Sequence, residues 1–294
     1  MDDSKKTKAA EWFATIRDRI CATFEQLEEE LPHDQPHADL PPGKFERTEW
    51  QRPDDPNGDG AGGHGGGGVM SVMRGGRVFE KVGVNISKVE GTFSEQFRRE
   101  IPGAEESGGA FWASGVSLVA HMRSPKVPAI HMNTRMIVTS KCWFGGGTDL
   151  NPMIEVPQDT ADFHAALKTT CDAHECADYP RYKEWCDDYF FIKHRNQARG
   201  VGGIFFDYLD SGDWDADFAF VRAVGECFND IYPALVRRHL GESWTDADRE
   251  WQLVKRGLYA EFNLVYDRGT RFGLMTGGNP EAVLMSLPPE AKWP

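Results

Sequence analysis

Residues 69–82 read Val-Met-Ser-Val-Met-Arg-Gly-Gly-Arg-Val-Phe-Glu-Lys-Val, and this stretch decides the fold class. Its two ends, Val69–Met73 and Val78–Val82, are short apolar runs with the period of a β-strand. Gly75 and Gly76 stand between them, and glycine best tolerates the positive φ of a tight hairpin turn. We therefore predict an antiparallel pair of strands here.

The rest of the chain adds strands and helices to this hairpin. An apolar stripe at steps of three and four predicts a helix over residues 4–31, which accounts for the N-terminal segment 1–31. Prolines and then glycines predict irregular chain over residues 32–68, apart from one short strand. Strands are predicted at Phe45–Trp50, Val84–Val89, Gly115–His121, Ala129–Val138, Gly203–Tyr208, Leu258–Tyr266 and Thr270–Met275. Helices are predicted near 94–101, 158–174, 180–198, 214–240 and 246–256, with Gly257 as a cap past the last of these.

The order of these elements indicates the fold class. Hairpins come first, helices follow, and hairpins return near the end of the chain. This order predicts an α+β fold, in which a large, mainly antiparallel β-sheet is flanked on both faces by α-helices. Residues 1–294 are expected to form a single domain.

Composition limits the classes of function. Lys and Arg number 33 and Asp and Glu 46, so the net charge is −13 and the chain is a poor partner for nucleic acid or anionic lipid. The chain contains no run of about 18 apolar residues, so we predict no membrane span. The acidic N-terminus lacks the features of a signal or transit peptide, so we expect a cytoplasmic protein. The 6 cysteines form no C-x-x-C pair, and we expect them to be reduced and structural.

The predicted strand Ala129–Val138 carries the clearest chemical signal. Side chains of a strand alternate between its two faces, so His131, Asn133 and Arg135 share one face, opposite an apolar one. Four residues at roughly 3.3 Å each place His131 and Arg135 about 13 Å apart. That span suits a large flat ligand with a carboxylate, because the guanidinium of Arg135 can donate two parallel hydrogen bonds to it. An ordinary solvated sheet face is the alternative.

Neighbouring segments add candidates for the same site. In Gly115–His121, Ser117 and His121 share a face and could reach the cavity of His131, although a structural role for His121 is the simpler interpretation. Asp267 ends the predicted strand Leu258–Tyr266 and is either a turn cap or a carboxylate directed into a cleft. Trp143–Leu150 is interpreted as a strand that enters a glycine loop, with Asp149 as a cap.

Histidines and aromatic residues give weaker signals. His121, His131, His164 and His194 suggest a metal site, but their spacing matches no standard ligand motif, so structural roles are favoured. Trp185 lies in an aromatic run with Tyr189, for which core packing is the default and the wall of a macrocycle pocket is the alternative.

Several long motifs, in one order, resemble those of the oxygen-dependent coproporphyrinogen III oxidase family. The resemblance runs from about Gly65 to Trp293. The motifs are Val78–Asn85 (VFEKVGVN), Gly115–Val119 (GVSLV), His131–Arg135 (HMNTR), Trp143–Gly147 (WFGGG), Lys183–Phe190 (KEWCDDYF), Glu261–Thr270 (EFNLVYDRGT) and Leu284–Pro289 (LMSLPP).

This resemblance implies a catalytic domain and a homodimer that acts on coproporphyrinogen III. The implied reaction is the oxygen-dependent oxidative decarboxylation of two propionates to vinyl groups, giving protoporphyrinogen IX in haem biosynthesis. It implies molecular oxygen as co-substrate and no required cofactor, with a divalent metal possible at the four histidines. Two alternatives stay open: a non-catalytic tetrapyrrole-binding protein, and a metal-dependent enzyme that uses the histidine cluster.

The resemblance also assigns roles to residues of this chain. It implies His131, Asp267 and Arg135 as catalytic residues, His131 moving a proton. It implies substrate contacts from Ser117, Asn133, Thr134, Arg135, Arg268, Gly277, Gly278 and Asn279. The chain departs from the family pattern at Asn279, where bacterial members commonly carry an arginine, at Leu258, at Tyr208, and in its end at Pro294.

Overall fold

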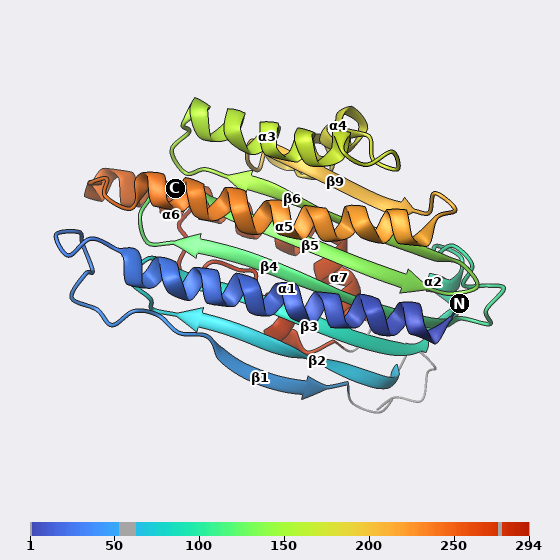
Figure 1. Cartoon of the computed structure of the whole chain (residues 1–294). Coiled ribbons are helices and arrows are strands. Elements are labelled where there is room, and N and C mark those ends of the chain that lie inside the picture. Colours follow the sequence, from blue (N-terminus) through green and yellow to red (C-terminus); the bar gives the residue numbers. More distant parts are fainter. Residues whose placement is uncertain (1, 53–62, 276–277, 294) are drawn as a thin grey trace.

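A single β-sheet with seven strands organises the chain (Figure 1). The computed structural model describes residues 2–52, 63–275 and 278–293. Every neighbouring pair in the sheet is antiparallel, in the order β1-β2-β3-β4-β5-β6-β9. These strands are β1 (Glu46–Gln51), β2 (Gly63–Arg74), β3 (Phe79–Thr92), β4 (Ala110–Met122), β5 (Ala129–Val138), β6 (Cys142–Asn151) and β9 (Gly202–Leu209). The predicted α+β class with a large antiparallel sheet is confirmed.

The hairpin of the opening motif is formed by β2 and β3, with Gly75 at φ +67° in the turn. The two predicted runs Val78–Val82 and Val84–Val89 merge into the single strand β3. The prediction of irregular chain up to residue 68 is wrong for Gly65–Gly68, which belong to β2. A Cβ at Gly67 would lie 2.1 Å from the carbonyl oxygen of Trp50, so these glycines allow a close approach of neighbouring backbones.

The glycine loop predicted after Phe144 is also wrong, for the same reason: neighbouring strands approach closely at these glycines. Strand β6 continues through this segment to Asn151, and Asp149 is not a cap but pairs in register with His131 of β5. A Cβ on Gly147 would meet the carbonyl oxygen of Ile204 on β9 at 2.3 Å. Glycine in β6 therefore marks tight packing between strands rather than a turn.

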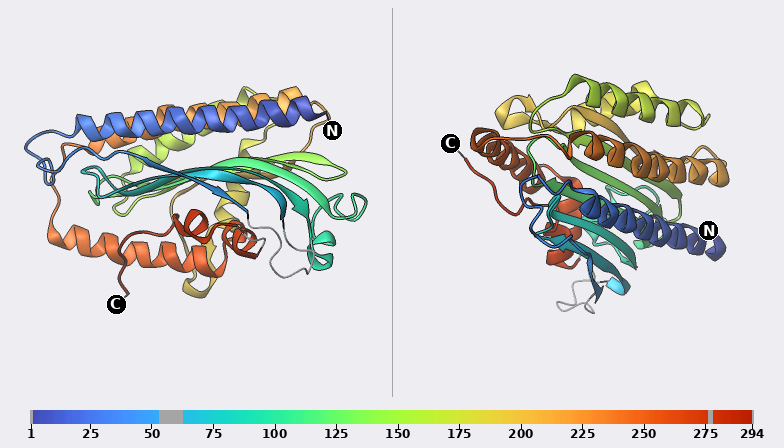
Figure 2. Two further views of the ribbon diagram at one scale, coloured as in Figure 1. Left: turned by 90° about the horizontal axis from the view of Figure 1, so that it is seen from below. Right: turned by 60° about the vertical axis from the view of Figure 1, so that its left-hand side comes forward.

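One face of the sheet is covered by α1 (Asp3–Glu30) and α5 (Trp214–His239), which lie side by side along it (Figure 2, left). The side chain of Phe24 on α1 stacks on Phe79 of β3 at 4.6 Å between ring centroids. It also contacts Phe228 and Tyr232 of α5. Burying each such side chain contributes about 1.5–3 kcal/mol, so this layer is the main core of the fold.

The opposite face carries α6 (Asp246–Val265), and α7 (Arg268–Met275) lies on the same side (Figure 2, left). The predicted strands Leu258–Tyr266 and Thr270–Met275 are therefore wrong, since both segments are helical. Apolar residues there fit a period of two nearly as well as a helical period. Thr245 and Asp248 form a capping box that starts α6, which then runs through Gly257 instead of ending there.

The remaining elements are short strands and helices. They are α2 (Glu95–Arg98), α3 (Pro157–Asp172), α4 (Tyr179–Tyr189), β7 (Phe191–Ile192), the 3₁₀ turn η1 (Lys193–Arg195), β8 (Gln197–Ala198) and α8 (Pro280–Leu284). The helix predicted over 180–198 thus ends at Tyr189, and a two-stranded pair follows. No helix in the described ranges has the length and apolar character to cross a membrane.

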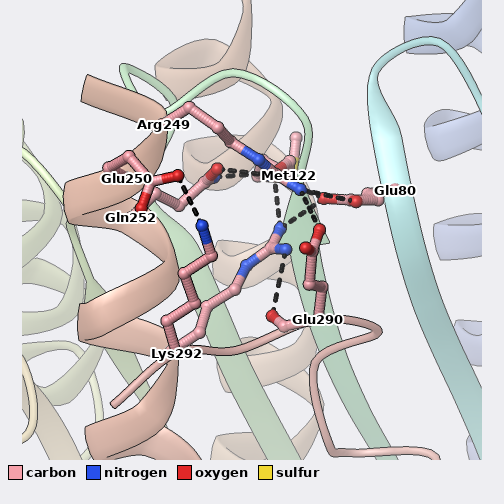
Figure 3. Close-up of polar contacts among 8 residues, drawn as sticks. Glu80, Met122, Arg249, Glu250, Gln252, Glu290 and Lys292 are labelled. Atoms are coloured by element: carbon pink, nitrogen blue, oxygen red, sulfur yellow. Dashed lines mark hydrogen bonds and ion pairs between the residues drawn. The ribbon is translucent and has the colours of Figure 1, made fainter. Parts of the chain in front are cut away.

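An ion-pair cluster holds α6 onto the sheet (Figure 3). The Glu80 carboxylate on β3 accepts hydrogen bonds from Arg249 at 2.8 and 2.9 Å and from Arg256 at 2.7 Å. Arg256 also donates to the carbonyl oxygen of Met122 at 2.8 Å, and Arg249 reaches Glu290 at 3.2 Å. We call this set the Glu80 cluster. It fixes the position of the helix that supplies one wall of the cavity described next.

Candidate active site

A cavity of about 560 Å³ lies between the sheet and the helices on the α6 side. Its volume falls within the range of about 300–1,000 Å³ that is typical of small-molecule sites. The sheet contributes residues of β3, β4, β5 and β9, and the other walls come from α4, α6, α7 and α8. The cavity therefore depends on segments that are far apart in the sequence.

Strand β5 supplies the polar floor of this cavity. His131, Asn133 and Arg135 all line it, whereas Met132 and Met136 are fully buried in the core beneath the sheet. Ser117 of β4 pairs in register with Asn133 and also lines the cavity. The predicted alternation of faces is thus confirmed. Thr134, implied as a substrate contact, is among the lining residues, but its side chain is only 1% exposed.

Hydrogen bonds fix the imidazole of His131. Its Nδ1 lies 2.9 Å from Asp149 Oδ1, and its Nε2 lies 3.1 Å from Asn133 Nδ2. An ionised carboxylate only accepts, so Nδ1 carries the proton and donates it to Asp149. Nε2 is then the basic nitrogen and accepts from the Asn133 amide. This arrangement suits a group that takes up or delivers a proton on the cavity side.

Asp149 is buried and nevertheless stays ionised. Burial alone would raise the pKa of this carboxyl group. The opposite effect of Arg199 and His131 is larger, so the pKa falls to about 2. Arg199 Nη2 lies 2.7 Å from Asp149 Oδ2, and both side chains are almost completely buried. Asn263 of α6 accepts from Arg199 at 3.0 Å, which links the sheet to the helix above it.

Aromatic rings enclose the guanidinium of Arg199. Its Cζ lies 4.0 Å from the ring centroid of Phe190, 4.5 Å from Tyr259 and 4.7 Å from Phe262. Cation–π contacts of this kind stabilise a desolvated cation. The sequence analysis missed Arg199 because its partner Asp149 is 50 residues away in the sequence.

Arg135 is held at the other end of the β5 floor. It donates to Asn133 Oδ1 at 3.1 Å and to Asp207 Oδ2 of β9 at 2.7 Å. Its side chain is 30% exposed, so the guanidinium is accessible from the cavity. Asp207, which was not singled out from the sequence, therefore orients Arg135 and partly neutralises its charge.

Asp267 reaches the same cavity from the junction of α6 and α7, not from the end of a strand. Its carboxylate accepts from Tyr189 Oη at 2.9 Å and from Thr270 N and Oγ1 at 2.7 Å. Burial raises the pKa of Asp267, but these hydrogen bonds lower it more, so the net shift is downward. The side chain of Arg268 lies over the Tyr189 ring at 5.2 Å. Tyr189 thus forms part of the cavity wall, whereas Trp185 packs on Phe205.

Two of the three residues implied as substrate contacts near the start of α8 are described. Gly278 and Asn279 line the cavity, and Gly277 lies outside the described residues. The Asn279 side chain accepts from Glu281 N at 2.9 Å and so caps α8. Its amide therefore has a structural role in starting this short helix.

The other histidines point to separate partners. His121 is fully buried, its Nε2 lies 2.9 Å from the Ser286 carbonyl oxygen, and burial lowers its pKa to about 3. His164 contacts Tyr179 and the Val201 backbone, and His194 contacts Tyr266 and Glu261. Within residues 2–52, 63–275 and 278–293, no group of three or more His, Cys, Asp or Glu side chains could hold a metal ion. The geometry of these side chains does not fit a metal centre.

The fold and this cavity define a protein with a desolvated acid–base site beside cations suited to an anionic ligand. The chain belongs to the coproporphyrinogen III oxidase family, whose sequence profile matches residues 8–294. It is 55% identical over 293 residues to the oxygen-dependent coproporphyrinogen-III oxidase of Rickettsia bellii (strain RML369-C). It is 53% identical to the proteins of the same name from Rickettsia africae and Rickettsia conorii. Each alignment covers 100% of this chain and 100% of the relative.

Proposed function

We propose that this protein catalyses the oxygen-dependent decarboxylation of coproporphyrinogen III to protoporphyrinogen IX in haem biosynthesis. For each of two propionates, one carboxyl group leaves as carbon dioxide and the side chain becomes a vinyl group. The two electrons and two hydrogens released reduce one dioxygen to hydrogen peroxide, so each step balances. The electron-rich pyrrole supplies the electrons, and no cofactor is included in this scheme.

One observation carries the proposal: His131, Arg135 and Asp267 line a single cavity of about 560 Å³. A macrocycle with carboxylates at its edge needs a cation for an acid group and a base near the reacting carbon. The β5 floor offers both, about 13 Å apart at roughly 3.3 Å per residue. The names of the Rickettsia relatives, at 53–55% identity over the full chain, support the same reaction.

Each residue then has a task that its surroundings explain. Arg135 binds a propionate carboxylate, sharing its guanidinium between that group and Asp207. His131 accepts a proton at Nε2 while Asp149 stabilises the imidazolium that forms. Asp267, ionised and directed at the cavity by Tyr189 and Thr270, accepts pyrrole N–H hydrogen bonds and stabilises positive charge on the ring.

The remaining parts of the assignment rest on the family resemblance and on composition. We propose that the active form is a homodimer located in the cytoplasm. Ser117 and Arg268, which also line the cavity, are proposed as further substrate contacts. Gly278 and Asn279 are proposed to contact the substrate from the rim.

Turnover with and without oxygen tests the function. Purified protein is incubated with coproporphyrinogen III in air and under argon, and the products are oxidised and separated by their porphyrin fluorescence. We expect protoporphyrin in air only, with activity retained after treatment with a chelator. Binding without conversion in air would identify a non-catalytic tetrapyrrole-binding protein, and loss of activity on chelation would identify a metal-dependent enzyme.

A further inference from the structure

Asn133 lies between the base and the cation of the β5 floor. Its side chain shares the cavity face of the strand with His131 and Arg135. Asn133 Nδ2 lies 3.1 Å from His131 Nε2, and Arg135 Nη1 lies 3.1 Å from Asn133 Oδ1. One amide therefore connects the nitrogen that takes up a proton to the guanidinium that we assign to a carboxylate.

Arg135 determines the orientation of this amide. A guanidinium only donates hydrogen bonds, so the atom that faces it is the oxygen Oδ1. The NH₂ group of Asn133 then points at His131 and occupies the lone pair of Nε2. A proton on Nε2 would face this N–H, and two donors form no hydrogen bond with each other. The orientation seen in the structure thus disfavours proton uptake by His131.

The amide has room to turn over. The residues that pair with Asn133 in register are Ser117 of β4 and Gly147 of β6, and both are small. Rotation about the Cβ–Cγ bond exchanges Oδ1 and Nδ2, and this terminal torsion of asparagine is only weakly restricted. The turned amide accepts from a protonated Nε2. It also places its NH₂ group against the Arg135 guanidinium, which is again a contact between two donors.

A carboxylate bound at Arg135 removes this second conflict. It accepts hydrogen bonds both from the guanidinium and from the NH₂ group of the turned Asn133. Hydrogen bonds to an ionised acceptor are about twice as strong as neutral ones, so a carboxylate displaces the amide oxygen from Arg135. The guanidinium is 30% exposed and is accessible from the cavity, while Asp207 stays bound to Nη2 at 2.7 Å.

We propose that Asn133 is a positioning residue that couples the two ends of the floor: a substrate carboxylate at Arg135 turns the amide, which lets His131 Nε2 take up a proton. This inference rests on the proposed function and deepens it. In the free protein the amide keeps His131 neutral, and in the complex its oxygen accepts from the imidazolium. Coupling of two binding events is reciprocal, so proton uptake strengthens carboxylate binding by the same factor.

Other charges also face His131, and their effect does not depend on the amide. Asp149 accepts from Nδ1 on the opposite side of the ring, and Asp267 interacts with the imidazolium charge. Both carboxylates favour the protonated form, whereas Arg199, which pairs with Asp149, opposes it. These groups keep their charges when the amide turns. Removal of the amide therefore isolates the contribution of Asn133.

The test counts protons during binding, so that it does not require turnover. Titration calorimetry measures the binding of coproporphyrin III, a stable oxidised macrocycle with four carboxylates, at neutral pH. Comparison of phosphate with Tris buffer, which differ in ionisation enthalpy, gives the number of protons taken up per ligand. The variants are Asn133→Ala and Asn133→Asp. Asn85→Ala is the matched control, because Asn85 also lines the cavity but donates to the Ala282 carbonyl oxygen of α8.

We expect wild type and Asn85→Ala to take up at least about half a proton per ligand, and Asn133→Ala about threefold less. The direct attraction between the ligand and the imidazolium is common to all three proteins, so this difference reports the amide. In Asn133→Asp the new carboxylate accepts from both Arg135 and a protonated Nε2, and His131 is protonated before the ligand arrives. The acidic limb of its kcat/KM profile should therefore lie about one pH unit or more above that of wild type.

A merely structural role for Asn133 predicts a different outcome, in which both variants lower kcat/KM equally at every pH. That result, or equal proton uptake by wild type and Asn133→Ala, would overturn the inference by itself. Melting temperatures measured in parallel show whether each variant is folded, and Asn133→Asp provides the test if Asn133→Ala is not. Failure of the wild-type protein to bind coproporphyrin III would instead refute the proposed function, and the inference with it.

Discussion

Removing the charge of Glu80 should destabilise the protein by about 3 kcal/mol, because it leaves two arginines without their shared partner. The Arg256 side chain is completely buried, and those of Arg249 and Glu80 are 21% and 14% exposed. Breaking a buried ion pair from one side costs about 3–5 kcal/mol. Glu80→Gln retains a hydrogen-bond acceptor, so the lower end applies. At about 2 °C per kcal/mol for a chain of this length, the melting temperature should fall by ~6 °C.

The assay is urea unfolding of wild type and Glu80→Gln over a range of pH. Burial raises the pKa of Glu80, but the hydrogen bonds and charges of Arg249 and Arg256 lower it more. The stabilisation is therefore present above the unfolded-state pKa of about 4.3 and is lost as the pH falls through the lower folded-state pKa. The gap between the two proteins should close on acidification.

A matched control separates burial from charge alone. Lys168 pairs with Asp172 on α3, and both side chains are 55% exposed, so Lys168→Ala should cost no more than about 0.5 kcal/mol. A loss of similar size in Glu80→Gln and Lys168→Ala, or one that does not depend on pH, would refute the role given to the Glu80 cluster.

Three further predictions concern the site. His131→Ala should lower kcat by about 100-fold or more while the Kd for coproporphyrin III changes by less than about threefold, since a proton-transfer group acts mainly in the transition state; unchanged turnover would remove His131 from this role. Arg135→Lys should raise KM about tenfold, because an ammonium cannot reproduce the two parallel hydrogen bonds of the guanidinium, and wild-type kinetics would contradict carboxylate binding there. Asp149→Asn should lower kcat by at least about 100-fold, because the imidazole loses its orienting carboxylate, and it should cost stability at neutral pH. With the pKa of Asp149 lowered to about 2, that stability cost should be complete above pH ~4 and diminish only as the pH falls toward 2, which acid unfolding of both proteins would check.

The sheet was predictable because its signals are local. Alternation along Ala129–Val138 places His131 and Arg135 on one face without any knowledge of distant residues, and the structure has them there. The hairpin at Gly75 is equally local, since the turn needs positive φ within a few residues. The glycines within β2 and β6 were wrongly predicted to lie in irregular chain or a loop. Glycine is needed there because a neighbouring strand approaches closely, which the local sequence does not show.

The α6 segment shows where local periodicity fails. A period of two places Tyr259, Glu261 and Asn263 on one face, and this pattern predicted a strand. In the helix only Tyr259 and Asn263, four residues apart, face the cavity. Glu261 points elsewhere and pairs with His194. The prediction thus located this segment at the site correctly but gave it the wrong secondary structure. The buried partners that stabilise the helix, such as Glu80, lie more than a hundred residues away in the sequence.

The pairing of charges within the cavity explains how a chain with a net charge of −13 can accept an anionic macrocycle. Arg199 is neutralised by Asp149 and serves to orient the base rather than to attract the ligand. Arg135 is balanced by Asp207, which leaves its accessible guanidinium able to share one carboxylate but adds no net attraction. Arg268 and Arg271 line the same cavity and form no ion pair with any other part of the described chain. Arg268 and Arg271, at the start of α7 beside Asp267, therefore supply positive charge for the remaining carboxylates. Under the proposed function, recognition is divided between a polar floor on the sheet, where Arg135 binds one propionate, and cations on the helical side, which offset the repulsion of the acidic protein.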